Sequence, residues 1–494
     1  MKKRQFTLAC ILAARMLASC SCGGAASSTT LPETTETDAP QTTEATNARY
    51  ASEPTLPALD MKGETFTIFS NGWCSYAPLS ITDIAPGEEN GEPLNDAAYR
   101  RAQKISEEYN VKLEHINNED TNAAYAQLAS VIAAGDNEYD IVIMRGHSIA
   151  NMITGGMLCD LDTVPNLNLD APYYDQSSLA SLALSGKHYA MLSNLTTLSY
   201  HSLLCAYFNK QLAEDYSIPD IYETVSDGKW TLDFMLKNGK IHASDVNNDG
   251  SYTAEDQYAF TYIVDNRDGL ATSSGITFAE ISKDGGISLT YNNGKSVEKL
   301  ITILEKLSDK ALSFDVHARS SEINKDEVGM FMNRQSLFHL SVINHAPQFR
   351  DMKDDFGIIP MPKYDEAQAD YYTPVTFKPV AVTTIPVTNS RLAETGIIME
   401  AMSYMGYTEL YDTFYDTLLK GKIARDAQSQ EMLDLVFSST RLDTGLAFNL
   451  GDMLSGVRNL FVNSDTGVTS YFASVQNRIE ASVKTLTDAM NEKK

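Results

Sequence analysis

The hydrophobic positions at the start of the folded body alternate between two spacings. Residues 65–70 read TFTIFS, which predicts a strand, and the Asn71-Gly72 pair after them predicts a turn. Apolar residues recur at helical spacing over DAAYRRAQKISEEYN and over residues 123–134, with the strand-like VKLEHI between them. The apolar run at residues 139–144, YDIVIM, is typical of a parallel sheet. The order strand, helix, strand, helix, strand predicts an α/β domain with its ligand beyond the carboxyl ends of the strands.

The rest of the body has a longer and mixed pattern. LLCAYFNKQLAEDY predicts a strand running into a helix, and QYAFTYIV, rich in β-branched and aromatic residues, predicts another strand. Further strand-like runs are VGMFM, SLFHLSVI, FGIIPMP and VAVTTIPV. Helical spacing recurs over TLDFMLKNGKI and SVEKLITILEKLSD, and KHYAMLSNLTTL predicts extended chain. The C-terminal region from SRLAETGIIMEAMSYM onwards is predicted to be mainly helical.

The N-terminus has the order of a bacterial secretion signal. A basic start, Lys2-Lys3-Arg4, precedes an apolar run that is too short to span a bilayer, which takes about 20 residues. The sequence Leu-Ala-Ser before Cys20 resembles the lipobox of bacterial lipoproteins. Residues 1–19 are therefore predicted to be a lipoprotein signal peptide, and Cys20 the lipidated residue. An ordinary secretory signal with an incidental cysteine is the alternative.

A polar segment follows the signal. Residues 27–47 contain one large apolar side chain, Leu31, and cannot bury enough surface to offset the entropy of ordering. Residues 20–62 are predicted to be a lipidated tether rich in Thr, Glu and Pro, which as a random coil would reach roughly 35 Å. A tether of this kind holds the body just outside the membrane.

Composition and charge limit the class of partner. Hydrophobic residues make up 43% of the chain, and the formal net charge is −26. Nucleic acid and acidic membrane surfaces are disfavoured as partners because both need a positive field. The body has an odd number of cysteines, Cys74, Cys159 and Cys205, which are predicted to be buried small residues and not a disulfide framework.

Residues 245–256 read DVNNDGSYTAED, which has the spacing of a twelve-residue calcium loop with Gly250 at the turn position. The predicted ligands are Asp245, Asn247, Asp249, Ser251, Thr253 and Asp256. The strand-like QYAFTYIV after the loop disfavours an EF-hand switch, which has helices on both sides. The prediction is a structural calcium ion that staples this part of the fold. A turn without an ion is the alternative.

Four stretches occur in a recognisable order: GEPLNDAAYRRAQKISEEYNVKLE, DIVIMRGHSIANMITGGMLCDLDTVPNLNLDAPYYD, YFNKQLAEDYSIPDIYETVSDGKWTLDFML and DFGIIPMPKYDEAQADYYTP. Together with the lipobox they resemble the bacterial extracellular solute-binding proteins of ABC transporters, in the carbohydrate-associated group. The resemblance covers roughly residues 63–440. It implies an α/β fold of the two-lobed periplasmic-binding-protein type (type II), with crossing hinge strands.

The resemblance also divides the body. It assigns residues 63–190 with about 378–430 to a first lobe, and residues 191–377 with about 431–494 to a second. It implies a monomer on the extracellular face of the cell membrane that is not an enzyme. The expected partners are a small-molecule carbohydrate, in particular an oligosaccharide, and an ABC transporter permease.

Sugar sites combine aromatic platforms with side-chain donors and acceptors. The predicted solute contacts follow the strands or lie near the return between lobes: Trp73, Tyr76, Arg145, His147, Arg334, Gln335, Tyr371 and Tyr372. Arg334 and Gln335 are included because the resemblance places the residues after VGMFM in the cleft. The alternative for each residue is an ordinary surface or core position. Trp230 precedes Thr231, a natural N-cap, and is predicted to be structural.

Catalytic signatures are missing from the sequence. It contains no GxSxG, HExxH, GxxxxGK[ST] or CxxC motif. Two other functions stay open. A glycan-degrading enzyme would need two carboxylates at a defined separation. A calcium-dependent adhesion or scaffold module would need a protein partner.

Overall fold

The computed structural model describes residues 51–491, except 72, 75–78, 81–82, 264–266, 378 and 420–426. The predicted signal peptide, Cys20 and the tether as far as residue 50 lie outside the described residues. Among the helices that are described, none combines the length and apolar character needed to cross a bilayer.

The first lobe is built on a four-stranded sheet with the order β14-β5-β1-β4. Its strands are β1 (Thr65–Ser70), β4 (Lys112–Asn117), β5 (Ile141–Arg145) and β14 (Ala381–Thr384). β1 pairs in parallel with β4 and β5, as predicted, and β14 joins β5 in antiparallel orientation. The sheet is therefore mixed, because the chain returns to it from the second lobe through β14.

The two helices predicted in the first lobe are α1 (Pro93–Glu108) and α2 (Thr121–Ala134). The Asp120 side chain caps α2 by accepting from the Ala123 N–H at 2.9 Å. Gly135 ends this helix with a left-handed φ of 75°. Three further helices belong to this lobe: α3 (Ile149–Thr154), α4 (Gln176–Leu182) and α13 (Leu392–Met405).

The second lobe is built on a five-stranded sheet with the order β10-β7-β11-β6-β12. Its strands are β6 (Leu204–Asn209), β7 (Tyr258–Tyr262), β10 (Ser313–Asp315), β11 (Ser336–Val342) and β12 (Phe356–Pro360). β7, β10 and β11 are parallel, whereas β6 is antiparallel to β11 and β12. Every residue of the five strands is buried, which explains their near-continuous apolar sequences.

One strand prediction in this lobe is wrong. The second-lobe helices include α6 (Lys210–Asp215), α7 (Ile221–Ser226), α8 (Leu232–Gly239), α9 (Arg267–Ser273), α12 (Ile323–Met332) and α15 (Ala427–Ser438). The run VGMFM, predicted as a strand, forms the end of α12. Met330 and Phe331 are buried, whereas Val328 and Met332 are only half-buried. A short apolar run fits a strand or a helix equally well, and its length does not decide between them.

Besides the later passage from α13 of the first lobe to α15 of the second, two crossing segments connect the lobes and pair with each other. One leads from the first lobe to β6, and the other leads from β12 back to β14. Isolated antiparallel bridges pair Met191 with Thr383 and Leu203 with Val375. The first segment, where KHYAMLSNLTTL predicts extended chain, thus has single bridges and a short helix, α5 (Leu198–His201). The two crossing segments lie side by side along the connection.

The end of the predicted tether is part of the folded body. Met61 is buried, and Leu56 and Leu59 pack against the first-lobe core. The Met61 N–H donates to the Tyr109 carbonyl at 2.8 Å. The described residues 51–62 therefore form an arm on the first lobe, so the expected boundary at residue 62 is too late in the chain.

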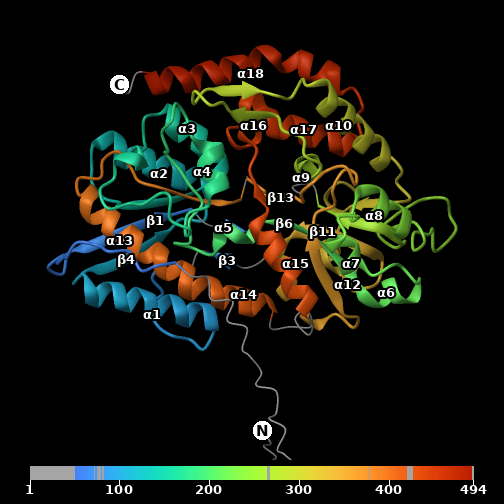
Figure 1. Cartoon of the computed structure of the whole chain (residues 1–494), viewed down its shortest axis with the longest axis horizontal. Coiled ribbons are helices and arrows are strands. Elements are labelled where there is room, and N and C mark those ends of the chain that lie inside the picture. Colours follow the sequence, from blue (N-terminus) through green and yellow to red (C-terminus); the bar gives the residue numbers. More distant parts are fainter. Residues whose placement is uncertain are drawn as a thin grey trace, which may run out of the picture. The chain divides into compact units, whose positions relative to one another are not determined.

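The C-terminal region is helical, as predicted, and reaches both lobes. We call the following elements the helical cap: β8 (Ala279–Ile281), β9 (Ile287–Leu289), α10 (Gly294–Leu307), α16 (Thr444–Ala447), α17 (Met453–Asn463) and α18 (Val468–Asn491). α18 packs on α3 of the first lobe and on α10, and it runs along one edge of the body in Figure 1. The C-terminal region therefore does not belong to the second lobe alone.

Candidate functional site

Neutral polar groups gather at the carboxyl end of the first sheet. Asn71 follows β1, is 1% exposed, and donates from Nδ2 to the Asn118 carbonyl at 2.6 Å. Its Oδ1 is buried and has no hydrogen-bond partner within the described chain. Ser70 Oγ lies 2.8 Å from His115 Nε2, and burial lowers the pKa of that imidazole to about 4. A buried acceptor without a donor is uncommon, so Asn71 Oδ1 marks a place for an outside donor.

Arg145 and His147 flank the end of β5, where ligands of such a sheet are expected. Both side chains are half-buried. A Cβ on Gly146, between them, would lie 2.4 Å from the Phe377 carbonyl oxygen. The returning segment therefore packs directly on the end of β5 and places both predicted residues at the junction of the lobes.

The carboxyl ends of the second sheet also carry polar residues. β7 ends at Tyr262, which pairs with Asp315 at the end of β10. β11 leads into a 3-10 helix, η4 (Ile343–Asp351), which carries Asn344. The Asn344 Nδ2 is buried and donates no hydrogen bond within the residues that the structure describes. Both sheets thus present amide groups with unused hydrogen-bonding capacity beyond their strand ends.

His201 lies on the first crossing segment and is almost fully buried. Its ring stacks on Phe414 of α14 (Tyr411–Leu419), with centroids 4.6 Å apart. Neither ring nitrogen has a hydrogen-bond partner in the described part of the chain. Burial lowers the pKa of His201 to about 4, against the opposing charge of Asp83, so the ring is neutral at pH 7. No local pattern distinguishes this histidine in the sequence, and it was not predicted.

Two predicted residues follow the first strand. The backbone of Trp73 forms β2 (Trp73–Cys74), which pairs with β3 (Leu79–Ser80). The Trp73 side chain and the whole of Tyr76 lie outside the described residues. Their contact with a solute stays a prediction.

Arg334 and Gln335 lie at the amino end of β11, opposite the end where a ligand is expected. Arg334 forms ion pairs with Asp354, at 2.9 Å, and with Asp215. Gln335 Nε2 donates to the Ala254 carbonyl, which belongs to the calcium-type loop. The prediction took VGMFM for a strand and therefore placed Arg334 and Gln335 after the carboxyl end of that strand. The run is the end of α12, so the two residues precede β11.

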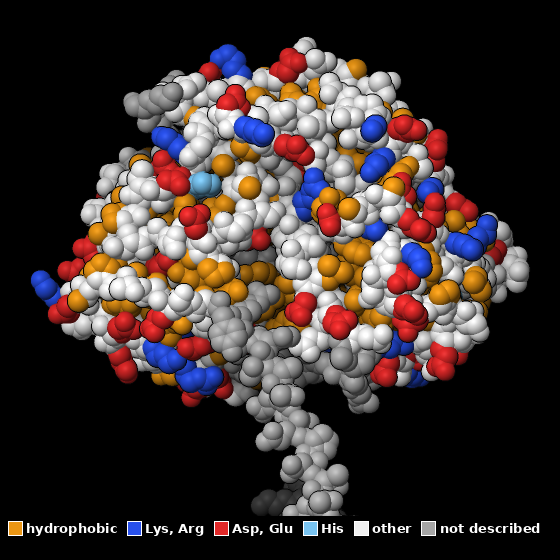
Figure 2. All heavy atoms as spheres, viewed as in Figure 1, with side chains coloured by type: hydrophobic (Ala, Val, Ile, Leu, Met, Phe, Trp, Pro, Cys, Tyr) orange, Lys and Arg blue, Asp and Glu red, His pale blue; other side chains and the backbone are white. Residues whose placement is uncertain are grey.

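Tyr371 and Tyr372 line a cavity of about 690 Å³ between α7, α15 and residues 438–441. The Arg441 guanidinium stacks on the Tyr372 ring, 4.2 Å from its centroid. An aromatic ring, a guanidinium and nearby hydroxyls are the groups that bind sugars. Figure 2 shows the face of the body hollowed near its centre, with hydrophobic side chains around the hollow.

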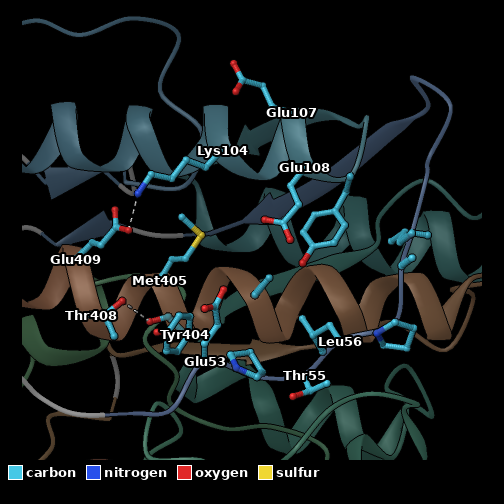
Figure 3. Close-up of a pocket in the computed structure, with 16 residues that line it drawn as sticks. Glu53, Thr55, Leu56, Lys104, Glu107, Glu108, Tyr404, Met405, Thr408 and Glu409 are labelled. Carbon is cyan, nitrogen blue, oxygen red and sulfur yellow. Dashed lines mark hydrogen bonds and ion pairs between the residues drawn. The ribbon is translucent and has the colours of Figure 1, made fainter.

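A larger cavity, of about 1060 Å³, lies within the first lobe (Figure 3). The arm lines one side of it, and α1 and the chain around Tyr404 and Met405 line the rest. Lys104 Nζ and Glu409 Oε1 are 2.7 Å apart beside it, and both are solvent-accessible. Its lining residues all belong to the first lobe, so this cavity is separate from the strand ends of the second sheet.

One buried group has the order of a catalytic triad. Ser341 Oγ lies 2.8 Å from His345 Nδ1, and His345 Nε2 lies 3.5 Å from Glu327 Oε1. Ser341 and His345 have no exposed surface, and burial lowers the pKa of His345 to about 3. A nucleophile must reach its substrate. The group therefore packs the second lobe and carries no reaction at the surface.

The calcium-type loop lies between α8 and β7, so a strand follows it, as predicted. Gly250 has a φ of 80°, which suits the sharp turn of such loops. Asp245 Oδ2 accepts from the Gly250 N–H at 2.8 Å. Asp256 is fully buried and accepts from the Thr253 N–H at 2.7 Å. These carboxylates close the loop through backbone hydrogen bonds.

The remaining predicted ligands share this arrangement. Asn247 Oδ1 accepts from the Asp249 N–H at 3.0 Å, and Asp249 Oδ1 accepts from the Ser251 N–H at 2.7 Å. Within the described residues, no three His, Cys, Asp or Glu side chains gather closely enough to hold a metal ion. Asp245 Oδ1, however, is buried without a hydrogen-bond partner in the described chain. The turn and this oxygen fit a calcium ion, and the ion stays a prediction.

Comparison with known proteins identifies the fold. No family model and no curated protein matches the sequence. The body is similar to an ABC substrate-binding protein from Listeria monocytogenes solved with cycloalternan (15% identity, 87% of this chain and 99% of that chain, TM-score 0.50). It is also similar to the GacH receptor of Streptomyces glaucescens, solved with acarbose (14%, 86% and 99%, TM-score 0.52). UgpB from Mycobacterium tuberculosis, solved with glycerophosphocholine, is a third (15%, 80% and 97%, TM-score 0.51).

These likenesses extend over nearly the whole length of the solved proteins. Each is below 25% identity, so what the chain shares with them is the architecture. The two sheets, the crossing segments and the returning strand β14 account for that likeness. The chain has the two-lobed periplasmic-binding-protein fold that ABC substrate-binding proteins have.

Proposed function

We propose that the chain is the solute-binding component of an ABC importer, and that it binds its solute between the two lobes. The observation that carries this proposal is the position of Asn71 and Asn344. Each follows the carboxyl end of a strand, one in each sheet, and each has a buried amide atom without a partner among the described residues. A solute between the lobes would supply the missing hydrogen bonds.

The solute in this proposal is a carbohydrate, and in particular an oligosaccharide. Neutral amides, together with Arg145, His147 and the Tyr372–Arg441 stack, suit a ligand with many hydroxyls and C–H faces. Two of the solved proteins hold cycloalternan and acarbose, whereas UgpB holds glycerophosphocholine. The protein acts by binding and releasing the solute, without catalysis, as a monomer.

Isothermal titration calorimetry against maltotriose, cycloalternan, acarbose and glycerophosphocholine tests the proposal. We expect heat of binding from at least one oligosaccharide. Trp73→Ala should weaken that binding by about 1–3 kcal/mol, the scale of one large apolar contact, and Tyr125→Ala in α2 should not. Binding of glycerophosphocholine alone would replace the carbohydrate with another solute. Hydrolysis of a sugar by the purified protein would overturn the binding role.

The proposal includes a lipid anchor that holds the protein on the extracellular face of the membrane, beside its permease. The order of basic, apolar and Leu-Ala-Ser-Cys residues supports this. Cys20→Ala should move the protein from the detergent phase to the aqueous phase in a partitioning experiment. Retention of the variant in the detergent phase would contradict lipidation at Cys20.

A further inference from the structure

The two lobes touch each other at a second place, away from the crossing segments. In the first lobe, a tight turn connects Leu184 to Lys187, which form an isolated bridge. In the helical cap, a second tight turn connects β8 to β9. The Ser185 N–H donates to the Gly285 carbonyl at 2.8 Å, from the first turn to the second. A backbone hydrogen bond therefore joins two turns that are about 100 residues apart in the sequence.

This turn contact is too close for any side chain at its centre. A Cβ on Gly285 would lie 2.8 Å from the Gly186 nitrogen and 2.9 Å from the Ser185 Cα. Real Cβ atoms do not approach backbone so closely, and the atoms they would meet cannot rotate away. Gly285 also has a φ of 81°, which disfavours other residues. The contact depends on glycine.

Two side-chain hydrogen bonds accompany the turn contact. Ser181 Oγ of α4 donates to the Leu442 carbonyl at 2.9 Å, and Thr444 Oγ1 of α16 donates back to the Ser181 carbonyl at 2.9 Å. These bonds join the first lobe to the start of α16. The adjacent Asp443 is buried and accepts from the Phe278 N–H at 2.7 Å. This bond holds the start of α16 against the residue that precedes β8.

α18 extends this connection across the body. Near its start, the Phe472 ring packs 4.8 Å from the Tyr291 ring, beside α10. At its centre, a Cβ on Gly451 would lie 2.6 Å from the Ile479 nitrogen, so the chain before α17 lies directly against the helix. α18 also packs on α3, in the first lobe.

The cap itself is attached to the second lobe. Arg458 of α17 forms an ion pair with Asp268 of α9 (Arg267–Ser273), the helix that comes soon after β7. Lys306 of α10 forms an ion pair with Asp233 of α8. A contact between the cap and the first lobe is therefore a contact between the two lobes.

We propose that the turn contact, with the Ser181–Thr444 bonds and the α18–α3 packing, is a latch that holds the two lobes together and resists their rotation. The lobes rotate relative to each other only when these bonds break, because the crossing segments alone leave that rotation free. The inference does not depend on which solute the protein binds.

Double electron–electron resonance between spin labels at Lys112→Cys, in the first lobe, and Lys240→Cys, in the second, tests the latch. The full chain is used without solute, with its native cysteines changed to alanine in every sample. In Gly285→Ala, we expect the ratio of latched to unlatched molecules to fall about fivefold, which corresponds to about 1 kcal/mol. A second interlobe distance should appear.

Gly186→Ala is the matched control. Its φ of 73° imposes a similar backbone strain, but a Cβ there meets nothing within 4 Å. It should keep the parent distance distribution. If Gly285→Ala fails to fold, as judged by circular dichroism, the double variant Ser181→Ala, Thr444→Val removes two latch bonds without a clash and should shift the distribution in the same direction. An unchanged distribution in the folded variants, or an equal shift in the control, would overturn the latch. Neither result bears on the calorimetric test of solute binding.

Discussion

At the scale of single residues, the helix N-cap signal at Thr231 was enough to predict a structural role for Trp230. Thr231 caps α8 by accepting from the Phe234 N–H at 3.2 Å, as the sequence predicted. Trp230 has no exposed surface, and its Nε1 donates to the Pro360 carbonyl at 2.8 Å. Its predicted structural role is confirmed. The indole fills the space between the start of α8 and the end of β12.

Tyr371 is a predicted solute contact whose hydroxyl already has two partners. It donates to the Val225 carbonyl at 3.0 Å and accepts from the Trp230 N–H at 3.3 Å. Tyr371→Phe should lower the free energy of unfolding by about 1–2 kcal/mol in urea denaturation, because buried backbone groups lose their partner. Tyr372→Phe, the control, should change stability little. A loss of solute affinity in Tyr371→Phe at unchanged stability would instead place Tyr371 in the site.

At the scale of elements, the calcium-type loop and β11 are linked. Gln335, just before β11, donates to the loop backbone at Ala254 and at Asp256. The Asp256 side chain is buried beneath the loop and accepts from the Val246 N–H at 2.9 Å. Order in the loop is therefore transmitted to the second sheet, so an ion bound there would stabilise this lobe.

Calcium should raise the melting temperature of the protein, because an ion that binds only the folded loop adds roughly 2.7 kcal/mol at a hundredfold excess over its dissociation constant. Asp249→Ala should abolish this response, since it removes a charged ligand from the loop. Asp465→Ala, in an exposed Asp-Thr-Gly turn elsewhere in the chain, should keep the response. Solute affinity should be the same with calcium and with chelator. A melting temperature that ignores calcium would show that DVNNDGSYTAED is a turn without an ion.

At the scale of the whole molecule, buried histidines set the response to acid. Burial lowers the pKa to about 4 for His115 and His201, and to about 3 for His345. Unfolding exposes these rings and restores pKa values near 6.5, so the unfolded state binds more protons below that pH. Asp443 opposes them, because burial raises its pKa to about 6. Burial also lowers the pKa of His242 and of His339, which act in the same direction, and raises the pKa of Asp160 and of Asp175, which act with Asp443. The histidines with a lowered pKa outnumber these carboxylates.

The stability of the protein should therefore be fully present above about pH 6.5 and fall as the pH drops towards 4. Each fully buried histidine contributes about 3 kcal/mol to this loss, and Asp443 returns a similar amount between about pH 6 and 4. Urea midpoints measured from pH 7.5 to 4.5 check the prediction. His201→Leu should reduce the pH slope by about one proton. A slope unchanged in this variant would show that His201 binds its proton equally well in the folded and unfolded states.

Prediction from sequence succeeded where a repeating pattern and its end signals agree. β1 was predicted with its observed bounds, because TFTIFS carries a strand pattern and a turn follows it. The helical pattern of α2 is likewise bounded by two end signals, the Asp120 N-cap and Gly135 at its end. The run VGMFM has neither signal, so its five apolar residues were assigned to the wrong type of element.

The site was less predictable, because it depends on contacts between distant segments. Arg145 and His147 could be placed from the end of one strand. Arg334 and Gln335 were placed in the cleft because VGMFM was taken for a strand, and they lie at the amino end of β11. Asn344 and His201 stand out only through buried atoms that have no partner among the described residues, which is a property of the packed molecule and not of the local sequence.

The arm at residues 51–62 decides how force enters the molecule. Its hydrogen bonds and apolar contacts are with the first lobe, through Met61, Tyr109 and the Asp60–Asn110 pair. Any pull along the preceding chain is therefore carried by the first lobe, while the second lobe bears no load from that side. The first lobe is then held in place by the preceding chain, and the second lobe moves relative to it. Tension on the chain therefore need not disturb the opening and closing between the lobes.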